Sequence, residues 1–176
     1  MEIRRTEKKD LDQLMEIYEM ARAFMAENGN PNQWGLSYPD RALLEEDVEE
    51  GNSYVCVDDG GEILGTFYFR IGDDMTYHVI QDGAWLNDEP YGVIHRIASA
   101  ARSKGVAGFC LNWCLERCTN LRIDTHRQNI PMQRFLEKNG FIPCGTIFTD
   151  DGTKRIAYQK KSHHPLERPK EPVSTE

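Results

Sequence analysis

The sequence predicts an α/β fold: a mixed, mostly antiparallel sheet of six or seven strands with helices on both faces. Short segments with the apolar alternation of strands recur along the chain, between segments with the apolar spacing of helices. Asp58-Asp59-Gly60-Gly61 is a hairpin signature between two strands, and a final hairpin is expected around Asp150-Asp151-Gly152. At 176 residues, one domain is the simplest organisation.

The composition is that of an acidic globular protein. Lys and Arg number 21 and Asp and Glu number 29, which gives a formal net charge of −8. Such a chain, without a basic stripe, disfavours nucleic acid as a partner and weakly favours a small or cationic substrate such as an amine. The charged N-terminus and the lack of an apolar run of about 18 residues predict no signal peptide and no membrane span. The five cysteines indicate reduced thiols in the cytoplasm.

The first half of the chain alternates strands with two helices. Leu11, Leu14 and Tyr18 recur at helical spacing, which predicts an amphipathic helix over residues 8–27 with Thr6 as its N-cap. The acidic segment 40–50 predicts a second helix, beginning near a proline and ending at a glycine. Strands are expected at residues 2–5, 53–57 and 63–71.

Two loops that are rich in aromatic residues are candidate walls of a substrate pocket. In residues 32–39, Trp34 and Tyr38 either staple the first helix to the second or line an acceptor site, and the sequence leaves both interpretations open. Residues 72–90 form a long insertion whose Tyr, His, Trp and Asp content suits recognition of a polar acceptor. The residues expected to bind substrate are Trp34, Tyr38, Trp85 and Tyr91, with Tyr77 as a further aromatic wall.

The segment from Ile94 to Phe141 organises the chain. Glycine and alanine at residues 105–108 leave room for a ligand to approach the backbone at the start of a helix. The free N–H groups and partial positive charge of a first helical turn make this junction an anion site suited to a phosphate. The expected elements are a strand at 94–98, a polar loop at 99–104, a helix from Gly105, a strand at 121–126, a helix at 131–139 and a final pair of strands at 144–148 and 155–160.

At these residues the chain resembles the GNAT N-acetyltransferase superfamily, in its bacterial small-molecule type. Arg102-x-x-Gly105-x-Ala107 fits the superfamily's Gln/Arg-x-x-Gly-x-Gly/Ala pattern. The resemblance covers about residues 50–160 and implies acetyl-CoA as cosubstrate, with the fourth and fifth strands parallel and splayed around its thioester. It leaves a homodimer open. Downstream, the superfamily's spacing is followed by Asn129, Met132, Phe135 and Gly140-Phe141.

The resemblance also assigns the cofactor site. The pyrophosphate is expected on the amides of residues 103–108, with added charge from Arg102 or Lys104, and the pantetheine arm against the backbone of residues 97–99. Asn129 would contact the cofactor, cap the following helix, or do both. The expected cofactor-binding residues are Ile97, Ala98, Ser99, Arg102, Ser103, Lys104, Gly105, Val106, Ala107, Gly108 and Asn129.

Acetyl transfer to an amine needs a group that accepts the amine proton. His95 on the fourth strand is the first candidate, against the competing interpretation of a hydrogen-bonded structural histidine. Asp124 and His126 alternate onto one face of the fifth strand and form the second candidate. The competing interpretation there is a structural Asp124 paired with Arg122 or Arg96.

Leu136 stands where the superfamily often has a tyrosine general acid. Cys144, Tyr158 or water are the candidate substitutes, unless the thiolate leaves unassisted. The predicted function is acetyl transfer from acetyl-CoA to a primary amine of a small molecule or peptide, by direct attack in a ternary complex. The missing tyrosine also supports an alternative, a non-catalytic CoA-binding or interaction module.

Cys110, Cys114 and Cys118 lie on one helical stripe. With His126 they suggest a metal-sensing site, but such a stripe is more often small core filler, and no metal is expected. The Pro- and charge-rich residues 162–176 predict a mobile tail after a domain of residues 1–161.

Overall fold

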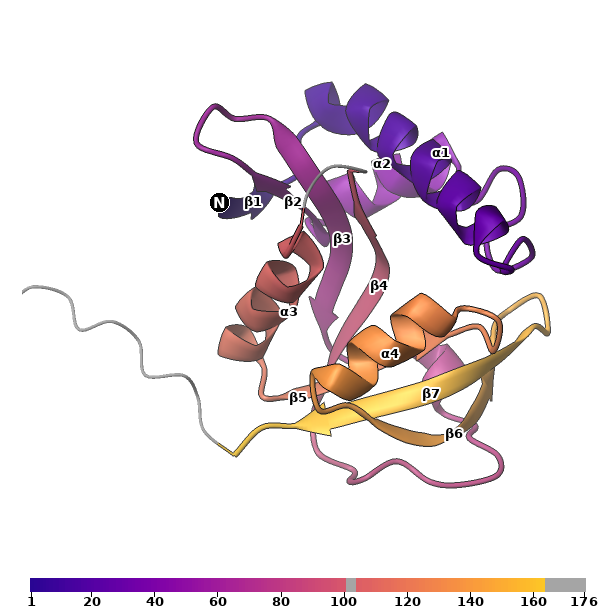
Figure 1. The fold of residues 1–176 in the computed structure, drawn as a ribbon. Helices are drawn as coiled ribbons and strands as arrows, with labels where there is room; N and C mark the ends of the chain where they lie inside the picture. Colours follow the sequence, from indigo (N-terminus) through magenta and orange to yellow (C-terminus); the bar gives the residue numbers. More distant parts are fainter. Residues whose placement is uncertain (101–103, 164–176) are drawn as a thin grey trace, which may run out of the picture.

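The computed structural model describes residues 1–100 and 104–163. Its centre is a seven-stranded sheet in the order β1-β2-β3-β4-β5-β7-β6 (Figure 1). Among these strands β4 and β5 run parallel, and the other neighbouring pairs are antiparallel, which confirms the predicted mixed sheet. The strands are β1 (Glu2–Arg5), β2 (Ser53–Val57), β3 (Ile63–Ile71), β4 (Gly92–Ser99), β5 (Asn120–Thr125), β6 (Ile142–Phe148) and β7 (Lys154–Lys161).

Helices cover both faces of the sheet, as predicted (Figure 1). Val55 and Cys56 are neighbours on β2, so their side chains point to opposite faces. Val55 belongs to the core cluster under α1 and α2, whereas Cys56 belongs to the cluster under α3 and α4. The helices are η1 (Lys8–Asp10), α1 (Leu11–Glu27), α2 (Arg41–Glu49), η2 (Met75–Tyr77), α3 (Val106–Arg117) and α4 (Ile130–Lys138).

The first helix begins differently from the prediction. A 3-10 turn precedes α1, and Glu7 rather than Thr6 is its N-cap, in a reciprocal capping box with Asp10. Thr6 is buried instead, and its hydroxyl accepts a hydrogen bond from Ser53 at 2.7 Å. Asp10 also accepts a bond from the Arg4 guanidinium at 2.7 Å, which compensates the burial of its carboxylate.

The parallel strands β4 and β5 separate soon after they meet. Their pairing is confined to Gly92 with Leu121 and Val93 with Arg122. Farther along, the β3–β4 register shifts and Arg96 adopts a φ of +52°, which marks a bulge in β4. The splayed pair predicted from the family resemblance is therefore present, and the β4 edge beyond Val93 is not paired with β5.

The insertion between β3 and β4 is ordered by its own packing. It contains η2, and Gln81 forms an isolated bridge with Thr146 of β6. Tyr77 is 1% exposed and packs in a third core cluster with Tyr91 and Val93. The insertion therefore covers the sheet face opposite α4.

Two residues of the predicted cysteine stripe pack in the core. Cys110 and Cys114 are buried in the cluster under α3, as predicted for small core residues. All five cysteines are free thiols.

Ser162 donates its backbone N–H to the Thr119 carbonyl at 2.7 Å, and residues 164–176 of the predicted tail lie outside the described residues. In the part of the chain that the structure describes, no helix has the length and apolarity to cross a membrane.

Candidate active site

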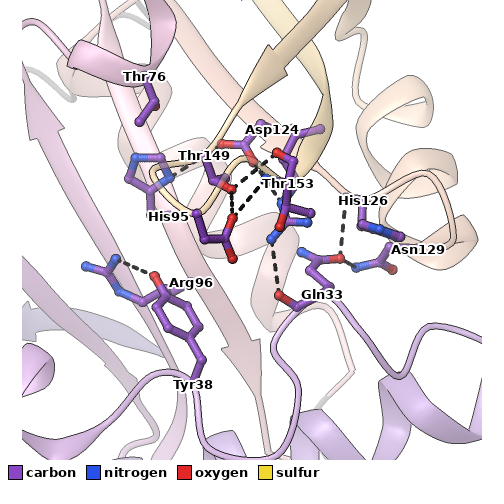
Figure 2. Close-up of polar contacts among 12 residues, drawn as sticks. Gln33, Tyr38, Thr76, His95, Arg96, Asp124, His126, Asn129, Thr149 and Thr153 are labelled. Carbon is purple, nitrogen blue, oxygen red and sulfur yellow. Dashed lines mark hydrogen bonds and ion pairs between the residues drawn. The ribbon is translucent and has the colours of Figure 1, made fainter.

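A cleft of about 650 Å³ opens where β4 and β5 separate. Its walls come from the loop after α1, the middle of β4, the end of β5, the start of α4 and the turn between β6 and β7. Figure 2 shows polar side chains from these elements converging on the cleft, with His95 joined to Asp124. The residues that line it include four carboxylates, Asp74, Asp124, Asp150 and Asp151.

His95 lies in the middle of β4 and faces a carboxylate from the insertion. Its Nε2 is 2.8 Å from Oδ2 of Asp74, whose other oxygen accepts bonds from the amide and hydroxyl of Thr76 at 2.9 and 2.7 Å. Burial acts to raise the pKa of Asp74, but the bonds from His95 and Thr76 outweigh it and hold that pKa well below its usual range. An ionised Asp74 accepts the Nε2 proton, so a neutral His95 has its lone pair on Nδ1.

Asp124 stands on the other side of His95. Its Oδ2 accepts a hydrogen bond from the Tyr77 hydroxyl at 2.8 Å and lies 3.8 Å from Nδ1 of His95. Its Oδ1 is 3.6 Å from Nε of Arg155, the ion-pair partner that sequence reasoning missed. Burial first and the Asp124 charge second raise the pKa of Tyr77, so this phenol stays a donor. The arrangement places Nδ1 of His95 near a carboxylate that has its own donors.

The predicted pairing of Asp124 with His126 is wrong. Nδ1 of His126 accepts a bond from the Gln128 amide at 3.2 Å, and the His126 amide points to Oε1 of Gln33 at 3.4 Å. Because β5 ends at Thr125, the alternation that was expected to keep His126 on the face of Asp124 no longer applies. Figure 2 shows His126 on the Gln33 side of the site.

Gln33 connects the loop after α1 to the start of α4 and to β7 through hydrogen bonds. Its Oε1 accepts bonds from the amide groups of Asn129 and Asn30 at 3.0 and 2.9 Å, and its carbonyl accepts Nη2 of Arg155 at 3.1 Å. Asn129 also caps α4 through the Met132 amide at 3.2 Å, which confirms the capping interpretation. Asn129 lines the cleft, and its contact with a cofactor stays a prediction.

Trp34 and Tyr38 pack and also line the cleft, and their contact with an acceptor stays a prediction. Trp34 is 9% exposed and meets the Tyr18 ring edge-on, with centroids 5.6 Å apart. The Tyr38 hydroxyl accepts a bond from Nη1 of Arg96 at 3.2 Å, and Nη2 of Arg96 binds Asp47 at 2.5 Å. Arg96 is thus neutralised by α2 rather than by the carboxylate on β5.

Trp85 and Tyr91 do not line this cleft, contrary to the prediction. The Trp85 indole donates to the Tyr77 carbonyl at 2.9 Å, and its ring lies 4.2 Å from the Arg122 guanidinium. The Tyr91 hydroxyl accepts the Asp74 amide at 3.0 Å and is 8% exposed as a residue. Both rings pack within the insertion. The Tyr91 hydroxyl binds the backbone of Asp74, whose carboxylate faces His95.

The start of α3 has the openness expected of an anion cradle. Gly105 adopts a φ of +78°, and its carbonyl accepts the first helical bond, from Phe109 at 3.0 Å. The N–H groups of residues 106–108 therefore have no acceptor within the helix. A Cβ built on Gly105 or Gly108 would meet nothing within 4 Å. These features leave room for a bulky anion, and binding of a diphosphate here stays a prediction.

The remaining predicted cofactor residues have different surroundings. Ile97 lines the cleft, whereas Ala98 and Ser99 pair with β3, and the Ala98 side chain is buried under α1. Val106 is buried, Ala107 is half-buried and Lys104 is exposed. Arg102 and Ser103 lie outside the described residues.

The candidate substitutes for the missing tyrosine acid do not line the cleft. Tyr158 is 1% exposed, and its hydroxyl lies 3.4 Å from Glu137; burial first, then that carboxylate, raises its pKa to about 12. Cys144 is buried and donates to the Ile142 carbonyl. Leu136 is fully buried. No group of three His, Cys, Asp or Glu side chains suited to a metal ion occurs among the described residues.

Comparisons with known proteins agree with this geometry. The profile of the acetyltransferase (GNAT) family matches residues 13–141. The chain belongs to the GNAT acetyltransferase family. As a member it is an acetyltransferase, and the fold is the one seen in solved GNAT structures. No curated protein matches the sequence.

Solved structures of GNAT proteins cover nearly the whole chain. A GNAT-family acetyltransferase from Streptococcus agalactiae 2603 is 33% identical with a TM-score of 0.83, over 93% of this chain and 96% of its own. One from Listeria monocytogenes 4b F2365 is 18% identical with a TM-score of 0.67, over 92% and 94%. A phosphinothricin acetyltransferase from Sinorhizobium meliloti, solved with AcCoA, is 18% identical with a TM-score of 0.61, over 98% and 95%. The last two share the fold.

Proposed function

We propose that this GNAT acetyltransferase transfers an acetyl group from acetyl-CoA to a primary amine of a small molecule or peptide, by direct attack in a ternary complex. The observation that carries the proposal is the separation of β4 and β5 beyond Val93 directly beside His95 and Asp124. Acetyl-CoA, when bound, would supply a thioester whose carbonyl carbon is open to attack by a neutral amine.

The start of α3 and the free edge of β4 are proposed to hold the cosubstrate. The N–H groups of residues 106–108 and the positive end of the α3 dipole would bind the diphosphate. The β4 edge from Ile94 to Ser99, which is not paired with β5, would offer backbone groups to the amide-rich arm. Ile97 lines the cleft at this edge.

His95 is the proposed proton acceptor. Asp74 holds the Nε2 proton, so the Nδ1 lone pair would take a proton from the incoming ammonium group. The resulting imidazolium would lie between two carboxylates, Asp74 at 2.8 Å and Asp124 at 3.8 Å, which would stabilise its charge. Both carboxylates, together with Asp150 and Asp151, which also line the cleft, favour a cationic acceptor over an anionic one.

Release of CoA thiol in the presence of a panel of amines tests the proposal. The panel holds a monoamine, a diamine, an amino acid and a short peptide. At least one should raise thiol release above the rate of hydrolysis and gain the mass of one acetyl group. Arg134→Gln, an exposed arginine on α4 outside the cleft lining, should keep the wild-type rate and is the control for variants in the cleft. CoA binding without stimulation by any amine would instead favour a non-catalytic CoA-binding module.

A further inference from the structure

A second groove, of about 590 Å³, lies between β1, the end of β3 and α3, and shares no lining residue with the cleft. Figure 1 shows β1 and α3 on the same side of the molecule. The groove is basic in a chain with a net charge of −8. Its charged lining residues are Arg4, Arg5, Arg70 and Arg117, with Glu50 as the single carboxylate.

The floor of this groove is aromatic and partly exposed. Tyr54 and Trp113 have ring centroids 4.8 Å apart and are both half-buried. The Arg117 guanidinium lies 3.5 Å from the Trp113 ring centroid. At the other end, Arg5 is the cross-strand neighbour of Tyr54. The aromatic pair therefore has the Arg117 guanidinium over one ring and Arg5 on the strand beside the other.

Three of the four guanidinium groups in this groove have no close carboxylate partner among the described residues. Arg4 has its own carboxylate at 2.7 Å, but Arg5 has no ion pair among the described residues. Nη1 of Arg117 donates to the Trp113 carbonyl at 2.9 Å, and its ion pair with Glu116, at 3.7 Å between half-exposed side chains, is weak. Arg70 bonds a backbone carbonyl, and its Nε is buried without an acceptor. Guanidinium groups that share a groove repel one another unless an anion joins them.

We propose that this groove binds a small aromatic anion, a flat ring that carries a carboxylate or phosphate. The ring would pack against Tyr54 and the part of Trp113 that Arg117 does not cover, and the anionic group would take the charge-assisted bonds that Arg5 and Arg117 leave open. The ring alone and the anionic group alone would each bind weakly. The aromatic side chains provide contact area, and the guanidinium groups discriminate against neutral rings. The proposal does not depend on the acetyl-transfer chemistry.

The probe is 2-naphthoate, titrated into the 176-residue protein without CoA and read at Trp113, which lines the groove and not the cleft. The chain has three tryptophans, so the indole N–H signal of Trp113 can be assigned in a proton–nitrogen spectrum with Trp113→Phe. Naphthoate should shift that signal saturably. The neutral 2-naphthamide and the ring-free acetate should each bind roughly tenfold more weakly.

The double variant Arg5→Gln, Arg117→Gln should weaken naphthoate binding by about tenfold or more, whereas Arg134→Gln should not change it. Thermal unfolding of each variant checks that the fold is retained. Three outcomes would overturn the proposal: equal binding of naphthoate and naphthamide, unchanged affinity in the double variant, and acetate binding as tightly as naphthoate. The last would indicate an adventitious ion only.

Discussion

Gly108→Glu separates the stability of α3 from its proposed role as a diphosphate cradle. Gly108 is the third residue of the helix, and a Cβ there would meet nothing within 4 Å. Replacing a helical glycine gains up to about 1 kcal/mol, and an acidic side chain in the first turn gains roughly 0.3–1 kcal/mol more. The free energy of unfolding should therefore rise by about 1 kcal/mol.

CoA binding should change in the opposite direction. Two unit charges about 5 Å apart repel by ~1 kcal/mol even at the dielectric constant of water. A diphosphate with about two charges would then lose ~2 kcal/mol, or roughly 30-fold in affinity. The same change at Gly105 is less informative, because its φ of +78° strains any other residue.

The assay is calorimetric titration of CoA at fixed salt, paired with urea unfolding of the same preparations. Gly108→Gln matches the size of the glutamate without its charge, and Gly108→Ala adds only the methyl group. Both controls should be stabilised and should bind CoA more tightly than the glutamate variant. Wild-type CoA affinity in a stabilised Gly108→Glu protein would refute the cradle at α3.

Three further predictions concern the cleft. His95→Gln should lower kcat by roughly 100-fold or more while CoA affinity stays within about twofold, measured by thiol release and calorimetry; loss of both together would indicate a structural histidine. Asp74→Asn should lower kcat by about tenfold. Burial acts to raise the pKa of Asp74, but hydrogen bonds from His95 and Thr76 outweigh it and lower that pKa. The ionised carboxylate therefore stabilises the fold above the usual pKa of aspartate, and this stabilisation is lost as the pH falls. The difference in unfolding free energy between wild type and Asp74→Asn should shrink below about pH 4, and a constant difference would contradict this. His126→Gln should leave kcat within about threefold. Burial, and after it the nearby arginines, lower the pKa of His126, so the unfolded chain binds more protons than the folded one. In urea unfolding, wild type should therefore lose more stability than the variant between about pH 7 and about pH 5. Equal losses would contradict this prediction.

Local patterns predicted most of the fold because strands, turns and helix starts are encoded by neighbouring residues. β1, β2 and β3 have the predicted bounds, 2–5, 53–57 and 63–71. The other elements shift by one or two residues, apart from the first helix, whose predicted range includes the 3-10 turn before α1. Thr6 failed as an N-cap because Ser53, remote in sequence, draws its hydroxyl into the sheet. Propensity cannot anticipate such a tertiary contact.

The site was harder to predict, because its decisive contacts join segments that are far apart in sequence. Asp74 and His95 are 21 residues apart, and the spacing along β4 says nothing about which insertion residue will face it. An Asp-Asp pair at the start of a Tyr- and His-rich insertion was the available signal. Trp85 and Tyr91 were assigned to the substrate pocket for the same reason. An aromatic residue in a loop can be buried or can bind a ligand, and the contacts of both rings with Tyr77 show that these two pack within the insertion.

The two faces of β4 offer separate positions for the two proposed reactants. Ile94 points into the cluster under α3 and α4, whereas Val93, on the face of His95, points into the cluster under the insertion. A cosubstrate held at α3 and an amine held beside the insertion would therefore approach the gap between β4 and β5 from opposite sides. Among the described residues that line the cleft there is no serine or cysteine to take the acetyl group. Direct attack by the amine, with His95 as the proton acceptor, is the route this division favours.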